Sequence, residues 1–143
     1  IHGGVFTATD KGFVSGNMTG GTKMVVSAGY TANSVCYTGT HDNLTMQQWF
    51  DEAAPEDIAM AKSYLGLNEE EGLVRGMIRA CMGSVSRLCV IQMQDYLELG
   101  ACARMNFPGT LSADNWTWRA PKGFITEELT KRIFDTTQRY GRL

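Results

Sequence analysis

The chain contains 143 residues, the usual length of one domain, and a chain of this size can bury enough surface to form a hydrophobic core. Its 13 basic and 15 acidic residues give a net charge of −2, and it has no run of Lys or Arg that would neutralise a phosphate backbone. No stretch approaches the roughly 20 apolar residues that cross a bilayer, and the first residues lack the pattern of a secretory signal. We therefore expect a cytoplasmic protein with no nucleic-acid or membrane partner.

The first thirty residues differ in composition from the rest of the chain. They contain seven of the sixteen glycines, with many Ser and Thr between them. Such a composition has little periodic apolar signal and favours turns or disorder over packed elements. We therefore assign residues 1–30 to a Gly/Ser/Thr-rich segment of uncertain origin and expect the fold in residues 31–143.

The first predicted strand covers residues 33–38 and leads into His41 and Asp42. It is rich in β-branched and aromatic residues and Gly39 follows it, which is typical of a short buried strand that ends in a loop. Barrels of alternating strands and helices keep their chemistry at the carboxyl ends of the strands. His41 and Asp42 are therefore candidates for a site. The alternatives are that Asp42 caps a helix starting at Leu44 and that His41 is an ordinary loop residue.

Three helices and a second strand are predicted next. Residues 44–50 form a short helix, and Pro55 opens a second helix that has acids in its first turn and ends at Gly66. Apolar residues at spacings of three and four predict a third helix over residues 69–83. The apolar run of residues 88–91 is typical of a parallel strand covered on both faces. Together these elements predict a right-handed crossover unit with parallel strands.

Polar residues also follow the second predicted strand. Gln94 and Asp95 occupy the same kind of position there as the polar pair after the first strand. Asp95 either pairs with Arg104 or caps a short helix that begins near Tyr96. We favour a structural role for Asp95, because a buried or half-buried charge needs a partner.

A loop and a final helix complete the chain. Residues 100–119 have the composition of a loop. Thr126 then caps a helix that has acids in its first turn and an apolar stripe, and Gly141 can end it. The whole pattern is that of an α/β protein.

The four cysteines are expected to be free thiols. They form no C-x-x-C motif, and no pair of histidines has the spacing of zinc ligands. Three of them lie in apolar runs, where a free thiol usually behaves as a small core residue. We therefore expect no metal site at Cys36, Cys81, Cys89 and Cys102, with disulfide and metal binding as the less favoured alternatives.

Five blocks of sequence carry a family resemblance. They are Tyr37–Asn43 (YTGTHDN), Ser84–Leu88 (SVSRL), Met93–Asp95 (MQD), Ala103–Gly109 (ARMNFPG) and Asn115–Arg119 (NWTWR). One block alone would be a weak signal, but five in the same order are not expected by chance. On these blocks the chain resembles the amylomaltases, which are 4-alpha-glucanotransferases or disproportionating enzymes.

The resemblance implies an elaborated (β/α)₈ TIM barrel. Such a barrel typically needs about 250 residues before insertions. This chain would supply the C-terminal portion of the barrel, from residues 31–143. That portion corresponds to about the last two β/α units and the C-terminal helix.

The resemblance also implies a chemistry, the transfer of alpha-1,4-glucan segments between maltooligosaccharides with retained configuration. Such a transfer uses two carboxyl groups roughly 5 Å apart, one attacking the anomeric carbon and the other protonating the leaving oxygen. By resemblance, Asp42 is a further catalytic carboxylate that stabilises the transition state, and His41 binds the same sugar. Asn115, next to Trp116 in the last block, is a candidate for a second substrate-binding residue, because an amide can bind sugar hydroxyls and an indole can cover a pyranose ring. The resemblance implies alpha-1,4-glucans as partners and neither cofactor nor metal.

Several features of the chain depart from the family. The nucleophilic aspartate and the acid/base glutamate lie on earlier barrel strands in the family, and no residue here matches their motifs. Leu44 stands where an acid is usual, Gln92 near a usual proline, and Cys102 where a glutamate is usual. Loss of that glutamate removes a possible partner of Arg104, which, like Arg119, could clamp a loop or contact substrate. We expect the isolated chain to be inactive.

Two alternatives to an enzyme segment follow from the same residues. One is a non-catalytic module, derived from the barrel, that binds oligosaccharides or another protein. The other is an isolated piece of the barrel whose strands are unpaired at the cut edge. Exposed strand edges invite association, so this alternative predicts self-association of the chain.

Overall fold

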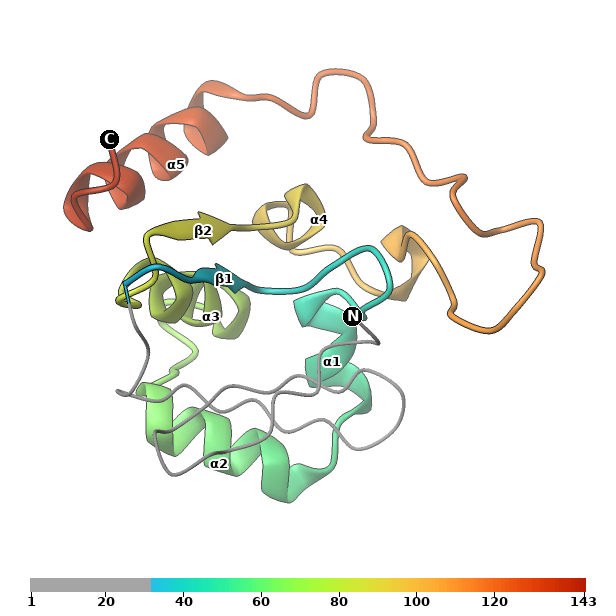
Figure 1. Cartoon of the computed structure of the whole chain (residues 1–143), viewed down its shortest axis with the longest axis horizontal. Coiled ribbons are helices and arrows are strands. Elements are labelled where there is room, and N and C mark those ends of the chain that lie inside the picture. Colours follow the sequence, from blue (N-terminus) through green and yellow to red (C-terminus); the bar gives the residue numbers. More distant parts are fainter. Residues whose placement is uncertain (1–31) are drawn as a thin grey trace.

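The computed structural model describes residues 32–143, whose elements are shown in Figure 1. Two strands enclose the crossover helices, in the order β1 (Val35–Tyr37), α1 (Met46–Glu52), α2 (Pro55–Leu65), α3 (Leu73–Met82) and β2 (Leu88–Val90). The remaining elements are α4 (Met93–Tyr96), the 3-10 helix η1 (Ala101–Ala103) and α5 (Glu127–Arg139). This is an α/β arrangement. The predicted Gly/Ser/Thr-rich segment of residues 1–30 lies outside the described residues.

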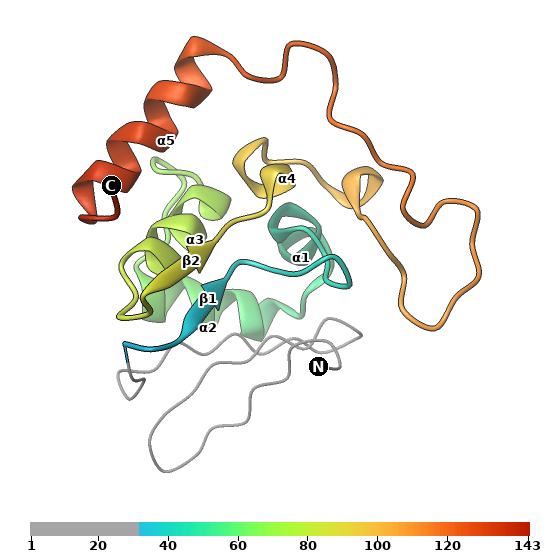
Figure 2. The same ribbon diagram turned by 45° about the horizontal axis from the view of Figure 1, so that its top comes forward.

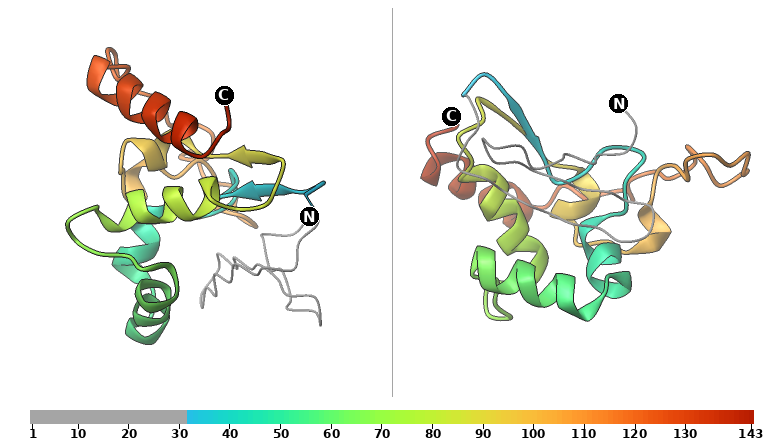
Figure 3. Two further views of the ribbon diagram at one scale, coloured as in Figure 1. Left: turned by 90° about the vertical axis from the view of Figure 1, so that its left-hand side faces the viewer. Right: turned by 60° about the horizontal axis from the view of Figure 1, so that its bottom comes forward.

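The two strands pair in parallel, as the sequence predicts. Cys36 of β1 lies opposite Cys89 of β2, and the side chains of these two residues share one face of the sheet. Helix α3 lies along the sheet in Figures 1 and 3, and its Cys81 side chain contacts Cys36. The predicted cover on both faces is wrong. The other face of the sheet is exposed, with 54% of Leu88 accessible, because no described helix packs against it.

The ends of the helices follow local chemistry. The Thr45 hydroxyl accepts a hydrogen bond of 3.1 Å from the Gln48 amide and caps α1. Helix α2 begins at its proline and ends at Gly66, whose φ of 62° lies in the left-handed region that glycine favours. Helix α3 begins at Leu73 and is shorter than predicted. Its start is delayed because Gly72 has a φ of 90°, which no helical residue adopts.

The core lies around α3, which contacts α1, α2, α4 and α5. The largest fully buried apolar side chains are Trp49, Met77 and Val74. Burial of each side chain of this size stabilises the fold by about 1.5–3 kcal/mol relative to exposure. Because Trp49 comes from α1 and the other two from α3, they join the first crossover helix to the central one.

Helix α5 closes the chain against this core. Thr126 caps it by accepting a hydrogen bond of 3.1 Å from the Leu129 amide, and Gly141 follows its last turn with a φ of 62°, as predicted. Arg132 of α5 donates to Glu98 Oε1 at 2.9 Å and to the Tyr96 carbonyl. These bonds hold α5 to the segment that follows β2.

Residues 104–126 connect η1 to α5 as a long segment without a helix or strand. Figure 2 shows this segment leaving the helical part of the molecule and returning at the start of α5. The residues that the structure describes include no helix with the length and apolar character needed to span a membrane.

Candidate functional site

The loops that follow the two strands meet at the carboxyl end of the sheet. After β1 the chain turns, with the Asn43 amide donating to the Thr40 carbonyl at 3.0 Å. The Asn43 side chain stabilises this turn, because its Oδ1 accepts from the Thr40 amide at 2.7 Å and from the Thr40 hydroxyl at 2.9 Å. Gly39 permits close contact with the other loop, since a Cβ atom there would lie 2.4 Å from Gln92 Nε2.

This turn presents His41 and Asp42 side by side. His41 Nε2 lies 3.3 Å from Asp42 Oδ1, and the exposed fractions of the two side chains are 56% and 28%. The carboxylate is therefore sheltered but open to solvent, as a group that contacts a ligand must be. The structure brings these two predicted residues together at the end of β1.

Asp42 does not cap the helix that follows it, which was the alternative role. Thr45 is the cap residue of α1. The amide of Met46, the first residue of α1, donates instead to Asp95 Oδ1 at 2.8 Å. Thr45 and Asp95 therefore provide the side-chain acceptors at the start of α1, and the Asp42 carboxylate makes its contacts within the candidate site instead.

Asn106 and Arg104, from the segment after η1, hold Asp42 from the other side. Asn106 Nδ2 donates to Asp42 Oδ1 at 2.7 Å. Arg104 donates to the Asp42 carbonyl at 3.0 Å and to the Asn106 carbonyl at 2.9 Å. Burial lowers the pKa of the Arg104 guanidinium, and the charges of Glu52 and Asp42 oppose this change. Arg104 thus clamps the backbone of both loops, and Asn106 orients the carboxylate.

Asn106 had no role in the sequence-based prediction. Its only signal was its position in the ARMNFPG block, where it stands two residues after the arginine. Its partner lies 64 positions earlier in the chain. A contact over such a separation leaves no periodic pattern, so the role of Asn106 follows only from the fold.

Asn115 lies in the same segment, but its amide is engaged within its own loop. Its Oδ1 accepts from the Phe107 amide at 2.9 Å, and its Nδ2 donates to the Thr110 carbonyl at 3.2 Å and the Thr110 hydroxyl at 3.1 Å. These bonds shape the loop between Phe107 and Asn115. Substrate binding by Asn115 stays a prediction, and it requires that an amide oxygen or nitrogen take an additional partner.

Trp116 brings the long segment to the site. Its ring lies 5.0 Å from that of His41, centroid to centroid, at an interplanar angle of 39°. Its amide donates to the Met105 carbonyl at 2.7 Å, and its φ of 66° is unusual for a residue with a side chain. The indole is 53% exposed. Arg119 clamps the same turn by donating to the Trp116 and Trp118 carbonyls.

Asp95 has a structural position at the second strand end. The residue is fully buried, and its contact with the Met46 amide caps α1 rather than its own helix α4. Asp95 does not pair with Arg104, whose guanidinium donates instead to the carbonyls of Asp42 and Asn106. Burial raises the pKa of the Asp95 carboxyl, and the hydrogen bond from Met46 opposes this rise. The favoured structural role agrees with this contact, although neither predicted partner is the one found.

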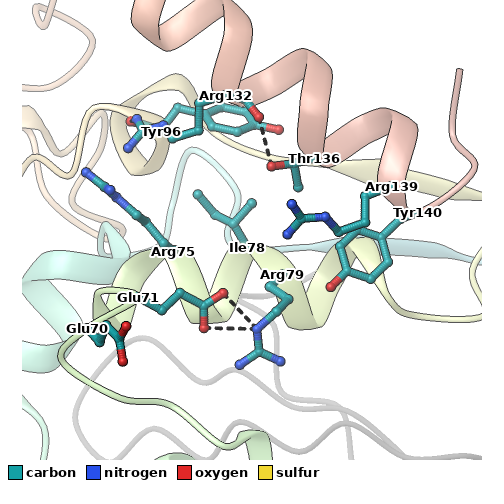
Figure 4. A pocket seen from close by; sticks show the side chains of 10 residues that line it. All are labelled: Glu70, Glu71, Arg75, Ile78, Arg79, Tyr96, Arg132, Thr136, Arg139 and Tyr140. Atoms are coloured by element: carbon teal, nitrogen blue, oxygen red, sulfur yellow. Dashed lines mark hydrogen bonds and ion pairs between the residues drawn. The ribbon is translucent and has the colours of Figure 1, made fainter.

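The described residues also form a hollow between α3 and α5, shown in Figure 4. Arg79 lines it and donates from Nε to Glu71 at 2.8 and 2.9 Å, and Arg139 points into it from α5. None of the predicted site residues lines this hollow. Within residues 32–143, no group of three or more His, Cys, Asp or Glu side chains is arranged to hold a metal ion.

Comparisons with known proteins agree with the sequence blocks. The family model described as 4-alpha-glucanotransferase matches residues 15–126. A 4-alpha-glucanotransferase of Clostridium butyricum is 46% identical over 114 residues, which cover 79% of this chain and 23% of the relative. The chloroplastic/amyloplastic 4-alpha-glucanotransferase of Solanum tuberosum is 42% identical over 114 residues, or 78% of this chain and 20% of the relative.

A solved structure gives the same result. An amylomaltase from Streptococcus agalactiae, in complex with acarbose, matches with a TM-score of 0.75 and 34% identity, covering 80% of this chain and 23% of the other. The chain spans about a fifth of the length of the relatives it matches. The family model and the relatives together show that this chain belongs to the 4-alpha-glucanotransferase family.

Proposed function

We propose that residues 32–143 form the C-terminal portion of a (β/α)₈ barrel that transfers alpha-1,4-glucan segments between maltooligosaccharides. The parallel β1–β2 pair with its crossover helices supports the barrel, because this is the repeating unit of such a fold. The similarity to an amylomaltase structure supports the same assignment. The catalytic part of the proposal rests on the setting of Asp42.

In this proposal Asp42, in the loop at the carboxyl end of β1, supplies the carboxylate that the family resemblance assigns to this position. Asn106 fixes Oδ1 at 2.7 Å and His41 lies 3.3 Å from the same atom, so the carboxylate is oriented before a ligand arrives. A preorganised negative group of this kind stabilises the positive charge that develops on a sugar ring in the transition state. In this proposal Asp42 has that role and His41 donates to a sugar hydroxyl.

The two other carboxyl groups of the reaction come, in this proposal, from parts of the barrel that the 143 residues do not supply. The attacking carboxylate and the proton donor must lie roughly 5 Å apart across the scissile bond. Asp95, the acid at the neighbouring strand end, is fully buried and bonded to α1, so it has neither access nor freedom for this task. The chain alone is therefore expected to produce no transfer products.

A chimera tests this proposal directly. The matched segment of the Clostridium butyricum relative is replaced by residues 32–143, and disproportionation of maltotriose is followed by chromatography of glucose and longer oligomers. We expect the chimera to be active and Asp42→Asn to lower its kcat by about 10²–10³-fold, the range found for removing one preorganised electrostatic group. Asp135→Asn, on the outer helix α5, is the matched control and should retain full activity.

The proposal fails if the folded chimera is active and Asp42→Asn changes its kcat no more than Asp135→Asn does. It also fails if the 143-residue chain alone disproportionates maltotriose, because a complete set of carboxyl groups would then exist here.

One observation favours a second candidate, a non-catalytic module that binds oligosaccharides. The Trp116 indole is 53% exposed beside His41, and such a face can cover a pyranose ring. Titration of the chain with maltotriose, followed by tryptophan fluorescence, separates the candidates. Saturable binding would show that the chain binds sugar without the rest of the barrel. We expect Trp116→Ala to abolish this binding. Phe134→Ala, which removes an exposed aromatic ring on α5, is the control and should preserve it.

A further inference from the structure

Three of the four cysteines come together from three different elements. Cys36 of β1 and Cys89 of β2 are register partners in the parallel pair, and both lie on the sheet face opposite Val35 and Leu88. Cys81, in the last turn of α3, contacts Cys36. Within the described residues all four cysteines are free.

The backbone already has the spacing that a disulfide between Cys36 and Cys89 requires. Neighbouring strands lie about 4.7–4.9 Å apart, and the Cα atoms of bridged cysteines are usually about 4.4–6.8 Å apart. The two Cβ atoms point to the same face because the residues are paired in register. A bond between their sulfur atoms therefore requires mainly rotation of the two side chains, with a small approach of the Cβ atoms to the roughly 3.5–4.5 Å that a disulfide needs.

The surroundings make Cys36 the nucleophile of the group. Hydrogen bonds from the thiols of Cys81 and Cys89 hold the pKa of Cys36 well below its ordinary value, against the effect of its burial. The pKa values of Cys81 and Cys89 are raised, mainly by the same contacts with Cys36. These contacts favour the thiolate form at Cys36 over the other two thiols, and the thiolate is the reactive form of cysteine.

A nearby cation supports this distribution of charge. The Arg142 guanidinium also lowers the pKa of Cys36 by electrostatic attraction. It is fixed in place by donating to the carbonyls of Met82 at 2.7 Å, Ser84 at 2.8 Å and Ser86 at 3.0 Å. These carbonyls belong to the last residue of α3 and to the turn between α3 and β2. Arg142 is therefore held in a fixed position near the cysteines.

Accessibility distinguishes the partners of Cys36. Cys81 is only 3% exposed, whereas Cys36 and Cys89 are half-buried. We propose that Cys36 and Cys89 are a redox-active pair that forms a disulfide across the parallel strands when a hydroperoxide oxidises Cys36. The Cys36 thiolate attacks the peroxide oxygen, giving a sulfenic acid and releasing hydroxide from hydrogen peroxide. The Cys89 thiol then attacks the Cys36 sulfur, forming the disulfide and releasing water.

This bond would join the two strands just before the loops that carry the candidate site. Cys36 precedes the loop of Asp42, and Cys89 precedes the loop of Gln92, whose side chain lies against Gly39. The oxidised and reduced chains would therefore differ next to the two loops of the candidate site. Oxidation of the pair would in this way affect how the two loops lie relative to each other.

The test uses the whole chain and a small excess of hydrogen peroxide, followed by intact mass spectrometry and peptide mapping without reduction. We expect the loss of two hydrogens and a linked peptide pair containing Cys36 and Cys89. Cys102→Ser, which removes the exposed fourth thiol, is the matched control and should form the same link. Cys89→Ser should stop at a sulfenic acid on Cys36 that dimedone traps, and Cys36→Ser should form neither product.

Oxidation of the wild-type chain in urea keeps the test decisive if a serine variant does not fold. The native chain should give the Cys36–Cys89 link preferentially, and the unfolded chain should lose this preference because the strand register is gone. A native chain that loses no hydrogens, or that links Cys36 to Cys81, to Cys102 or to another molecule, overturns the proposal.

Discussion

The buried Asp95 carboxylate offers a sharp test of how the site is supported. Asp95→Ala removes the acceptor of the Met46 amide, whereas Asp95→Asn retains an oxygen at the same place. Both variants remove the charge, so the difference between them isolates the hydrogen bond and the small space that Ala leaves. A buried amide without a partner costs about 1–3 kcal/mol. We expect the free energy of unfolding of Asp95→Ala to be lower than that of Asp95→Asn by this amount.

The measurement is urea unfolding followed by tryptophan fluorescence, because Trp49 is buried in the same helix α1 whose start Asp95 caps. If the two variants unfold with the same free energy, within about 0.3 kcal/mol, the Met46 amide has found another acceptor and the capping role of Asp95 is refuted.

The pH dependence of the same variants adds a second readout. Burial raises the pKa of Asp95 in the folded chain. Protonated Asp95 therefore contributes to the free energy of unfolding. This contribution is complete below the pKa of the unfolded chain, about 3.9, and is lost as the pH rises through the higher pKa of the folded chain. Asp95→Asn cannot lose this proton. The stability of Asp95→Asn relative to the wild type should therefore increase from about pH 4 to pH 7.5, and a constant difference would contradict the assigned direction of the shift.

Three other predictions follow from single contacts. In the active chimera, Asn106→Ala should lower kcat for maltotriose less than Asp42→Asn does, because it leaves the carboxylate present but without its donor at 2.7 Å; an unchanged kcat would show that Asn106 does not orient Asp42. Gly66→Ala should reduce the free energy of unfolding by about 1 kcal/mol because of its positive φ, whereas Gly100→Ala, at a negative φ, should not; equal effects in urea unfolding would disprove this reason. If the exposed sheet face drives association, light scattering should show oligomers of the wild-type chain and monomers of Leu88→Lys, and a wild-type monomer at high concentration would count against it.

The local features of the fold were predictable from the sequence because their causes are local. The start of α2 at its proline, its end at Gly66 and the capping of α5 by Thr126 each depend on a few neighbouring residues. The parallel pairing followed from the length of chain between the strands. The prediction that β1 and β2 are buried was wrong. Whether a sheet face is covered depends on elements that are distant in sequence, and an apolar run does not reveal them.

The site was predictable in its position and not in its contacts. The turn around Asn43 is held by local bonds and presents His41 and Asp42 side by side, so their position could be predicted from the motif, while their role stays a prediction. The contact of Asn106 with Asp42 and that of Asp95 with Met46 span 64 and 49 positions. Both depend on the crossover helices having brought the two strand ends together, so neither could be derived from spacing.

Asp42 and Asp95 show how the same residue type after two parallel strands takes two roles. Each follows its strand by a short loop, and sequence position alone gives no reason to distinguish them. The structure buries Asp95 completely and directs Oδ1 at a helix amide, so its oxygen serves the scaffold. It leaves Asp42 28% exposed and orients it by the side chain of Asn106, so its oxygens can serve a ligand. Because Asp95 fixes the start of α1, which directly follows the Asp42 loop, the buried carboxylate positions the open one.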